Sequence, residues 1–287
     1  EITRRDLLGG VTAAALAHGL SPLPAAEDLP VAQFRFGLCT YLWGRDWKLP
    51  ALIEHCEKTG FLGVELRTQH KHGVEAGLDA AARREVKKRF ADSPVTCVGP
   101  GCNWQFHQPD ESQFRKNIEG AKAYVRLSRD IGGTGVKVKP NALVKGELQE
   151  KTVARIAAGL NEVGRFAADH GQEIRVEVHG RGTSSLPVMK AIFEQVTEKS
   201  VGVCWNSNAQ DLAGDGLAHN FNLVADRLAG TAHVRELDGK YPYPDLMNLF
   251  RKARWDGWML LEARTKPKDR IAAMKQQMAL FKKMTTA

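Results

Sequence analysis

The sequence predicts an α/β protein, a single-domain (β/α)8 TIM barrel, on three observations. The chain has 287 residues, close to the roughly 250 residues typical of this barrel. From residue 34 onward, short β-rich runs alternate eight times with longer runs of helical period, and this alternation predicts parallel strands with right-handed crossovers. No GxGxxG follows the first run and no P-loop sequence occurs, which argues against an open nucleotide-binding sheet.

The predicted strands are continuous apolar or β-branched runs bounded by Gly or Pro, as expected of buried parallel strands. They cover residues 34–41, 62–66, 95–98, 135–139, 174–178, 201–205, 232–235 and 258–261. The predicted helices cover residues 50–59, 78–89, 110–130, 148–170, 186–198, 217–228, 243–253 and 267–284. The first of them opens with Pro50 and ends before Gly60, residues that favour a helix start and a helix end.

Composition limits the functional classes. Hydrophobic residues make up 43% of the chain, which is enough for a core, and the net charge is +8. The Lys and Arg residues follow helical spacing and form no aromatic-interleaved basic stripe, so we expect solvated helix faces and no nucleic-acid partner. The five cysteines form no CxxC pair, which argues against a cysteine zinc site.

Residues 1–26 resemble an export signal rather than part of the fold. Arg4 and Arg5 precede Leu7 and Leu8, a Gly/Ala-rich apolar run follows, and small residues precede a break. This layout is typical of a twin-arginine signal, so we expect a periplasmic or otherwise exported protein. The apolar run is too short to span a bilayer, which predicts no stable membrane anchoring. The alternative is a cytosolic amphipathic helix. The barrel domain is expected over residues 34–287.

Four polar residues fall at the ends of the last four predicted strands. They are Glu177, Asn206, His233 and Glu262, one in each successive βα unit. Strand ends of a barrel converge at one mouth, where active sites lie. Two carboxylates, an imidazole and an amide oxygen suit one divalent metal ion, and Mn, Mg, Co and Zn all fit this set. Taken singly, a Glu at a strand end is more often an ion-pair partner and a His is more often a hydrogen-bonded core residue, so the metal site is predicted from the four residues together.

The same residues carry a resemblance to a known family. Residues 176–179 (Val-Glu-Val-His), residues 233–237 (His-Val-Arg-Glu-Leu) and their order resemble the xylose isomerase-like barrels of the tagatose 3-epimerase type. The resemblance extends over nearly the whole chain after residue 34. It implies that Glu177, Asn206, His233 and Glu262 hold one metal ion. Asn206 stands where the family usually has Asp, which leaves one negative charge fewer, and Ala209 stands where epimerases often have His.

The resemblance also implies a sugar isomerase or epimerase that removes a proton next to a carbonyl. It assigns that work to Glu177 and Glu262, with a small-molecule sugar as the partner. Export favours an unphosphorylated keto-sugar or an oxidised glycoside. With a carbonyl at C3 of a glycoside, the same site would catalyse β-elimination, so a 3-keto-glycoside lyase is the main alternative.

Further residues near the predicted mouth are candidates for substrate contact. They are His179, Glu65, Lys139, His72, Trp104 and Glu236. Alternatives remain open for several of them. His179 would equally serve as a hydrogen-bond partner behind the site, and Glu65 as the ion-pair partner of Arg67 or a lysine. Lys137 and Lys139 would bind substrate or form a buried ion pair with Glu65 or Glu177.

Two rival functions use the same fold. An endonuclease for abasic DNA would need more His, Asp and Glu ligands than this sequence offers at its strand ends, and export argues against it. A non-catalytic exported sugar-binding barrel is favoured by the missing charge at Asn206. A homo-oligomer formed through the barrel helices remains open.

Overall fold

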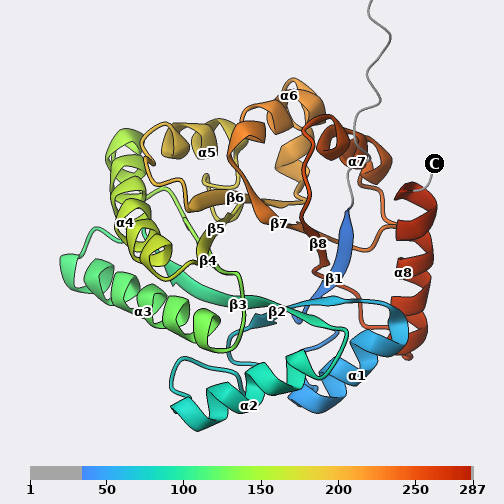
Figure 1. The fold of residues 1–287 in the computed structure, drawn as a ribbon. Helices are drawn as coiled ribbons and strands as arrows, with labels where there is room; N and C mark the ends of the chain where they lie inside the picture. The colour runs from blue at the N-terminus through green and yellow to red at the C-terminus, as the bar shows by residue number, and fades with distance from the viewer. Residues whose placement is uncertain (1–33, 286–287) are drawn as a thin grey trace, which may run out of the picture. The chain divides into compact units, whose positions relative to one another are not determined.

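The computed structural model describes residues 34–285 and shows a closed barrel of eight parallel strands surrounded by helices (Figure 1). The strands follow one another in chain order around the barrel. They are β1 (Arg35–Cys39), β2 (Gly63–Arg67), β3 (Thr96–Gln105), β4 (Gly135–Lys139), β5 (Glu173–Glu177), β6 (Val201–Asn206), β7 (Leu228–Val234) and β8 (Trp258–Leu261). The predicted (β/α)8 barrel is confirmed.

Each strand is followed by a helix that packs on the outside of the barrel. The helices are α1 (Leu49–Thr59), α2 (Ala80–Ala91), α3 (Glu111–Asp130), α4 (Gln149–Asp169), α5 (Leu186–Phe193), α6 (Gly216–Asn222), α7 (Tyr243–Lys252) and α8 (Arg270–Thr285), with short 3-10 turns η1 (Ala209–Leu212) and η2 (Ala225–Arg227). Local chemistry sets several ends. Asp79 and Asp110 cap α2 and α3, while Gly60 ends α1 in the left-handed conformation at φ 80°.

Several predicted elements have different extents in the structure, and the two largest differences concern β3 and α6. The predicted strand 95–98 continues as β3 to Gln105, through a Gly-Pro-Gly segment that suggested a strand end. The register shifts where β3 passes β2, which is a β-bulge, and Gly99 adopts φ 139° beyond it. The predicted helix 217–228 is wrong at its end. Leu228 already pairs with Val203 as the first residue of β7.

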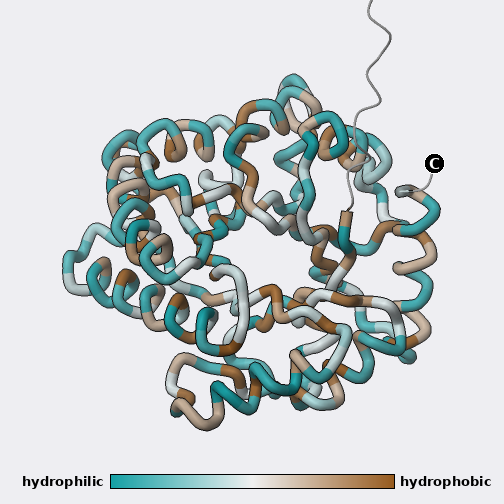
Figure 2. The backbone as a smooth tube through the Cα atoms, in the orientation of Figure 1, coloured by the Kyte–Doolittle hydropathy of each residue, from teal (hydrophilic) through white to brown (hydrophobic). Residues whose placement is uncertain are grey.

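The apolar residues form two clusters. The larger one fills the layer between the strands and the helices, and the smaller one contains Cys39, Val98, Trp258 and Leu260. Along β8, Trp258 and Leu260 alternate with residues of the larger cluster, so the smaller cluster lies inside the barrel. Hydrophilic and hydrophobic residues alternate along the surrounding helices (Figure 2), as expected when one helix face is buried.

Charged residues also lie among the strands. Arg175 of β5 is 3% exposed. Its guanidinium donates to the Val98 carbonyl and the Thr134 hydroxyl, at 2.9 and 2.7 Å, and its Nε lies 2.8 Å from the Glu173 carboxylate. Burial of the Arg175 guanidinium is tolerable because these three contacts satisfy its donors.

The helices of the described part, residues 34–285, include none that is both long and apolar enough to cross a bilayer. The predicted export signal, residues 1–26, lies outside the described residues and stays a prediction.

Candidate active site

The four predicted metal ligands meet at the carboxyl ends of β5 to β8. Glu177 ends β5, Asn206 ends β6, and Glu262 directly follows β8. His233 is the direct register partner of Asn206 across β6 and β7. All four side chains are at most 2% exposed. The structure therefore brings the quartet together at the barrel mouth, while its role as a metal site stays a prediction.

Three of the four side chains are arranged to fit a divalent ion. One ligand atom each from Glu177, His233 and Glu262 lies within 4.8 Å of the other two. His233 Nε2 lies 3.1 Å from Glu65 Oε2, and its buried Nδ1 has no hydrogen-bond partner among the described residues. A metal-bound histidine commonly donates its second N–H to a carboxylate. The tautomer that Glu65 selects therefore leaves the Nδ1 lone pair of His233 available for an ion.

Glu65, on β2, is the carboxylate that orients His233. It is 1% exposed, and its other oxygen accepts a hydrogen bond from Cys39 Sγ at 3.6 Å. Burial alone would raise the pKa of Glu65, but the neighbouring His233 ring and Lys137 ammonium lower it to about 2. Gly101 of β3 leaves room for this carboxylate, since a Cβ at that position would lie 2.4 Å from Glu65 Oε1.

Glu177 is held by two neighbours. Lys137 Nζ lies 2.8 Å from Glu177 Oε2, and both side chains are at most 1% exposed. Asn206 Nδ2 donates to Glu177 Oε1 at 3.1 Å. Burial opposes both charges, yet their mutual attraction raises the pKa of Lys137 and holds the pKa of Glu177 well below its usual range. Of the two alternatives stated for Lys137, the structure shows the buried ion pair with Glu177.

Glu262 is held by two arginines. Arg67 Nη1 lies 3.3 Å from Glu262 Oε1, and Arg264 Nη2 lies 3.2 Å from Glu262 Oε2. Both guanidinium groups lie over the Tyr41 ring, at 5.1 and 5.6 Å from its centroid. The sequence left open an ion pair between Arg67 and Glu65, and the structure instead pairs Arg67 with Glu262. The result is a carboxylate whose two oxygens are each fixed by a cation.

Two of the predicted substrate residues lie half-buried at the rim. His179 follows the end of β5, and its Nδ1 lies 2.8 Å from Asn141 Oδ1. Burial lowers the pKa of His179, which favours the neutral ring. Lys139 ends β4, and burial together with the nearby Lys137 lowers its pKa. Both side chains are therefore placed to contact a ligand at the mouth.

His72 and Trp104 have different surroundings. His72 is 7% exposed, and both of its ring nitrogens bond backbone groups, Nε2 with the Arg67 carbonyl and Nδ1 with the Val74 N–H. These bonds fix the loop after β2. Trp104, near the end of β3, borders a cavity of about 410 Å³ that Tyr124 also lines.

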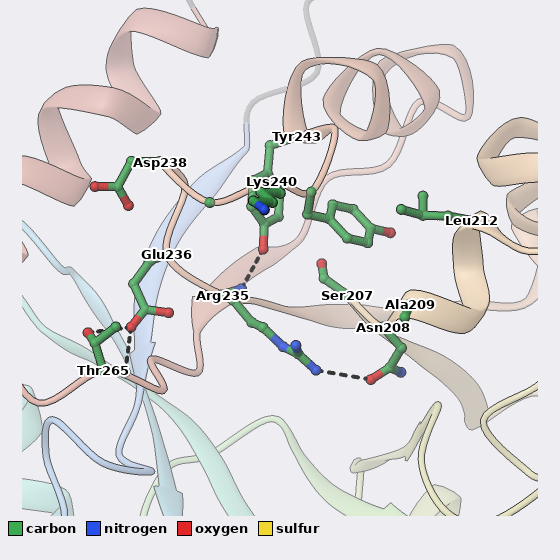
Figure 3. Close-up of a pocket in the computed structure, with 12 residues that line it drawn as sticks. Ser207, Asn208, Ala209, Leu212, Arg235, Glu236, Asp238, Lys240, Tyr243 and Thr265 are labelled. Carbon is green, nitrogen blue, oxygen red and sulfur yellow. Dashed lines mark hydrogen bonds between the residues drawn. The ribbon is translucent and has the colours of Figure 1, made fainter.

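A second cavity, of about 470 Å³, opens beside the ends of β6 and β7 (Figure 3). Arg235 extends across it toward Asn208, with Nη2 3.5 Å from Oδ1. Glu236, a predicted substrate residue, instead accepts hydrogen bonds from the Thr265 hydroxyl and from the backbone N–H groups of Arg264 and Thr265. These contacts attach the loop after β8 to the loop after β7.

Sequence reasoning missed Arg264 and Tyr41, and it considered Arg67 only as a partner of Glu65. The spacing of the two arginines in the sequence could have identified them as site residues. Arg67 follows Glu65, and Arg264 follows Glu262, by two residues. Two residues is the period of a strand, so Arg67 lies on the same side of β2 as Glu65, while Glu262 and Arg264 lie in the loop that follows β8.

Solved structures with a similar fold include three whose names bear on this site. The first is a 3-keto-D-glucoside 4-epimerase from E. coli, with a TM-score of 0.74 and 15% identity over 88% of this chain and 100% of that one. The second is a D-psicose 3-epimerase in the presence of D-fructose, with a TM-score of 0.73 and 15% identity over 88% of this chain and 100% of that one. The third is the IOLI protein with a bound zinc atom, with a TM-score of 0.72 and 15% identity over 88% of this chain and 96% of that one. At these identities the likeness shows the fold alone.

Comparison by sequence gives the family. No curated protein matches this sequence significantly. A family model described as xylose isomerase-like TIM barrel matches residues 53–284. The match extends from α1 to α8 and includes all four residues of the quartet. The chain therefore belongs to the xylose isomerase-like TIM barrel family.

Proposed function

We propose that this protein is a metal-dependent enzyme of the sugar isomerase and epimerase type. It would remove a proton from the carbon next to the carbonyl of an unphosphorylated keto-sugar or oxidised glycoside. The observation that carries this proposal is the cluster of Glu177, His233 and Glu262, in which Glu65 holds His233 Nε2 and Nδ1 has no hydrogen-bond partner in the described barrel. The names of similar structures, two sugar epimerases and a zinc-containing protein, support it.

The proposed ligands are Glu177, Asn206, His233 and Glu262. When bound, a divalent ion (Mn, Mg, Co or Zn) would polarise the sugar carbonyl and so make the C–H of the neighbouring carbon more acidic. Glu177 and Glu262 are the candidates for accepting and returning the proton. Lys137 holds Glu177, while Arg67 and Arg264 hold Glu262, so both carboxylates are fixed in direction before substrate arrives.

The two cavities support a substrate larger than one sugar ring. One of about 470 Å³ is lined by Ser207, the neighbour of Asn206, and the other, of about 410 Å³, is lined by the loop after β2, the end of β3 and α3. A glycoside has a group at C1 that needs such room. The predicted export signal supports an unphosphorylated substrate. A glycoside with a carbonyl at C3 would also permit β-elimination, which expels the C1 group through the same proton abstraction.

The test is proton exchange at carbon in D2O, followed by NMR, with keto-hexoses and 3-keto-glucosides as substrates and Mn²⁺ or Zn²⁺ added. Glu177→Gln and Glu262→Gln are each expected to slow exchange by about 10² or more, because a positioned base typically contributes that much. Glu173→Gln is the matched control. It removes a carboxylate from the opposite end of β5 and should leave exchange unchanged.

The products separate the remaining alternatives. Exchange with a changed configuration supports an epimerase, and exchange with loss of the C1 group supports the lyase. A protein that binds these sugars but exchanges no proton would overturn the proposed enzyme and favour a sugar-binding barrel.

A further inference from the structure

We propose that Lys137 is a resident cation of this site, whose ammonium group neutralises Glu177 in the metal-free protein and competes with the divalent ion for that carboxylate. The inference rests on the proposed metal site and adds a property that the four ligands alone would not have. It concerns the affinity for the ion and the stability of the protein without it.

The first support is the enclosure of the Lys137 side chain. Lys137 belongs to the largest fully buried side chains of the described barrel, and its ammonium is 2.8 Å from Glu177 Oε2. The ammonium also donates a hydrogen bond to the Cys102 carbonyl, at 3.4 Å. Asn206 occupies the remaining oxygen of Glu177. Both carboxylate oxygens are therefore already engaged, and an arriving ion competes with these contacts for the oxygens of Glu177.

The second support is the charge balance of the mouth. Each of its three buried carboxylates already has a cationic or proton-donating partner within 3.3 Å. Glu65 pairs with His233, Glu177 with Lys137, and Glu262 with both Arg67 and Arg264. Among the four proposed ligands, Asn206 carries no charge. A cluster balanced in this way does not need a dication to remain folded.

A third support comes from the position of Lys137 on the barrel. β4 lies directly beside β5, and Lys137 pairs in register with Arg175, two residues before Glu177. The long side chain therefore reaches from one strand to the end of the next. Its charge acts on a ligand of the ion without occupying a ligand position itself, so coulombic repulsion between ammonium and dication must lower the metal affinity.

The experiment compares the full chain with Lys137→Met, a substitution of similar length that removes the charge. Both proteins are stripped with a chelator and titrated with Mn²⁺ and with Zn²⁺ by calorimetry, and their melting temperatures are measured with and without the ions. We expect Lys137→Met to bind the ions at least tenfold more tightly. We also expect it to melt lower without metal and to gain more from added metal than the native protein does.

Two variants provide controls. Lys190→Met removes the charge of an exposed lysine of α5 that pairs with Glu194 at 3.7 Å, and it should leave the affinity unchanged. Asn206→Asp adds a negative charge beside Glu177 while keeping Lys137. It should also raise the affinity and lower the metal-free melting temperature, and it tests the charge balance if Lys137→Met fails to fold.

The outcomes separate this inference from the proposed function. If the native chain binds metal and neither Lys137→Met nor Asn206→Asp binds it more tightly, the competition is overturned while the metal site stands. If none of the proteins binds an ion, the resident-cation inference and the metal site both fail. Proton exchange without added metal then decides whether the enzyme proposal survives.

Discussion

At the scale of single residues, Glu65 determines which nitrogen of His233 is free. Its carboxylate accepts from Nε2 at 3.1 Å and leaves Nδ1 without a partner among the described residues. Glu65→Gln keeps the size of the side chain but removes the charge. We expect metal affinity to fall by about 10- to 100-fold, as is typical when the hydrogen-bond partner of a ligand is lost. Calorimetric titration with Zn²⁺ measures the change.

A control and a second readout distinguish orientation from general damage. Glu75 lies in the loop after β2, where its carboxylate accepts hydrogen bonds from the hydroxyls of Thr68 and of Tyr124 of α3. Glu75→Gln removes this carboxylate and should leave the affinity unchanged. The ¹⁵N shifts of the His233 ring should report a changed tautomer in Glu65→Gln only. Unchanged shifts together with unchanged affinity would contradict the role given to Glu65.

The quartet could be predicted from sequence because its members recur at strand ends, and barrel geometry brings such ends together. The partners of these residues could not. Arg67 and Glu262 are 195 positions apart, and the choice of Glu262 rather than Glu65 as the partner of Arg67 depends on how long side chains cross the mouth. For the same reason the sequence could not decide whether Lys137 binds substrate or forms a buried ion pair. Strand alternation predicts which side of the sheet its side chain lies on, but not which group it contacts.

At the scale of elements, β3 shows that the sequence pattern alone does not always predict where a strand ends. Strands β4 and β8 have the predicted bounds because their ends are marked in the sequence. β4 is a short alternating Val/Lys run that ends before Pro140, and β8 is a short apolar run that begins after Gly257. β3 continues through Gly99, which sequence reasoning took as a boundary. The bulge beside β2 and the φ of 139° at Gly99 depend on contacts with the neighbouring strands, which no local pattern contains.

The backbone conformation at Gly99 makes a glycine necessary for stability at this position. A Cβ at Gly99 would lie 2.0 Å from the Gly135 carbonyl oxygen of β4, a backbone atom that cannot move aside without disturbing the sheet. Gly99→Ala is therefore expected to lower the free energy of unfolding by about 3 kcal/mol, from backbone strain and overpacking together. Urea unfolding measures the difference.

Gly77→Ala is the matched control for that substitution. Gly77 precedes α2, has no left-handed φ, and a Cβ there would meet no atom within 4 Å. Its replacement should be neutral or slightly stabilising, because alanine restricts the unfolded chain. Equal effects at the two glycines would show that β3 tolerates a side chain at position 99.

At the scale of the whole molecule, the barrel depends on the seam between β1 and β8. These strands join the two ends of the described chain in four register pairs, from Arg35–Trp258 to Leu38–Leu261. Helix α8 covers the seam, and Phe281 stacks on Phe36 of β1 with centroids 4.5 Å apart. The closed fold is therefore complete only when the last helix is present.

Two truncations test this arrangement. A chain that starts at residue 27 keeps all eight strands and helices, so it should melt within about 2 °C of the full chain, a shift that corresponds to 1 kcal/mol or less. A chain that ends at residue 269 loses Met274 and Phe281, both buried. Their burial alone contributes about 3 to 6 kcal/mol, comparable with the roughly 5 to 15 kcal/mol that stabilises a whole domain. Circular dichroism should therefore show no cooperative melting for this second chain. A cooperative transition near that of the full chain would mean that the seam between β1 and β8 holds without α8.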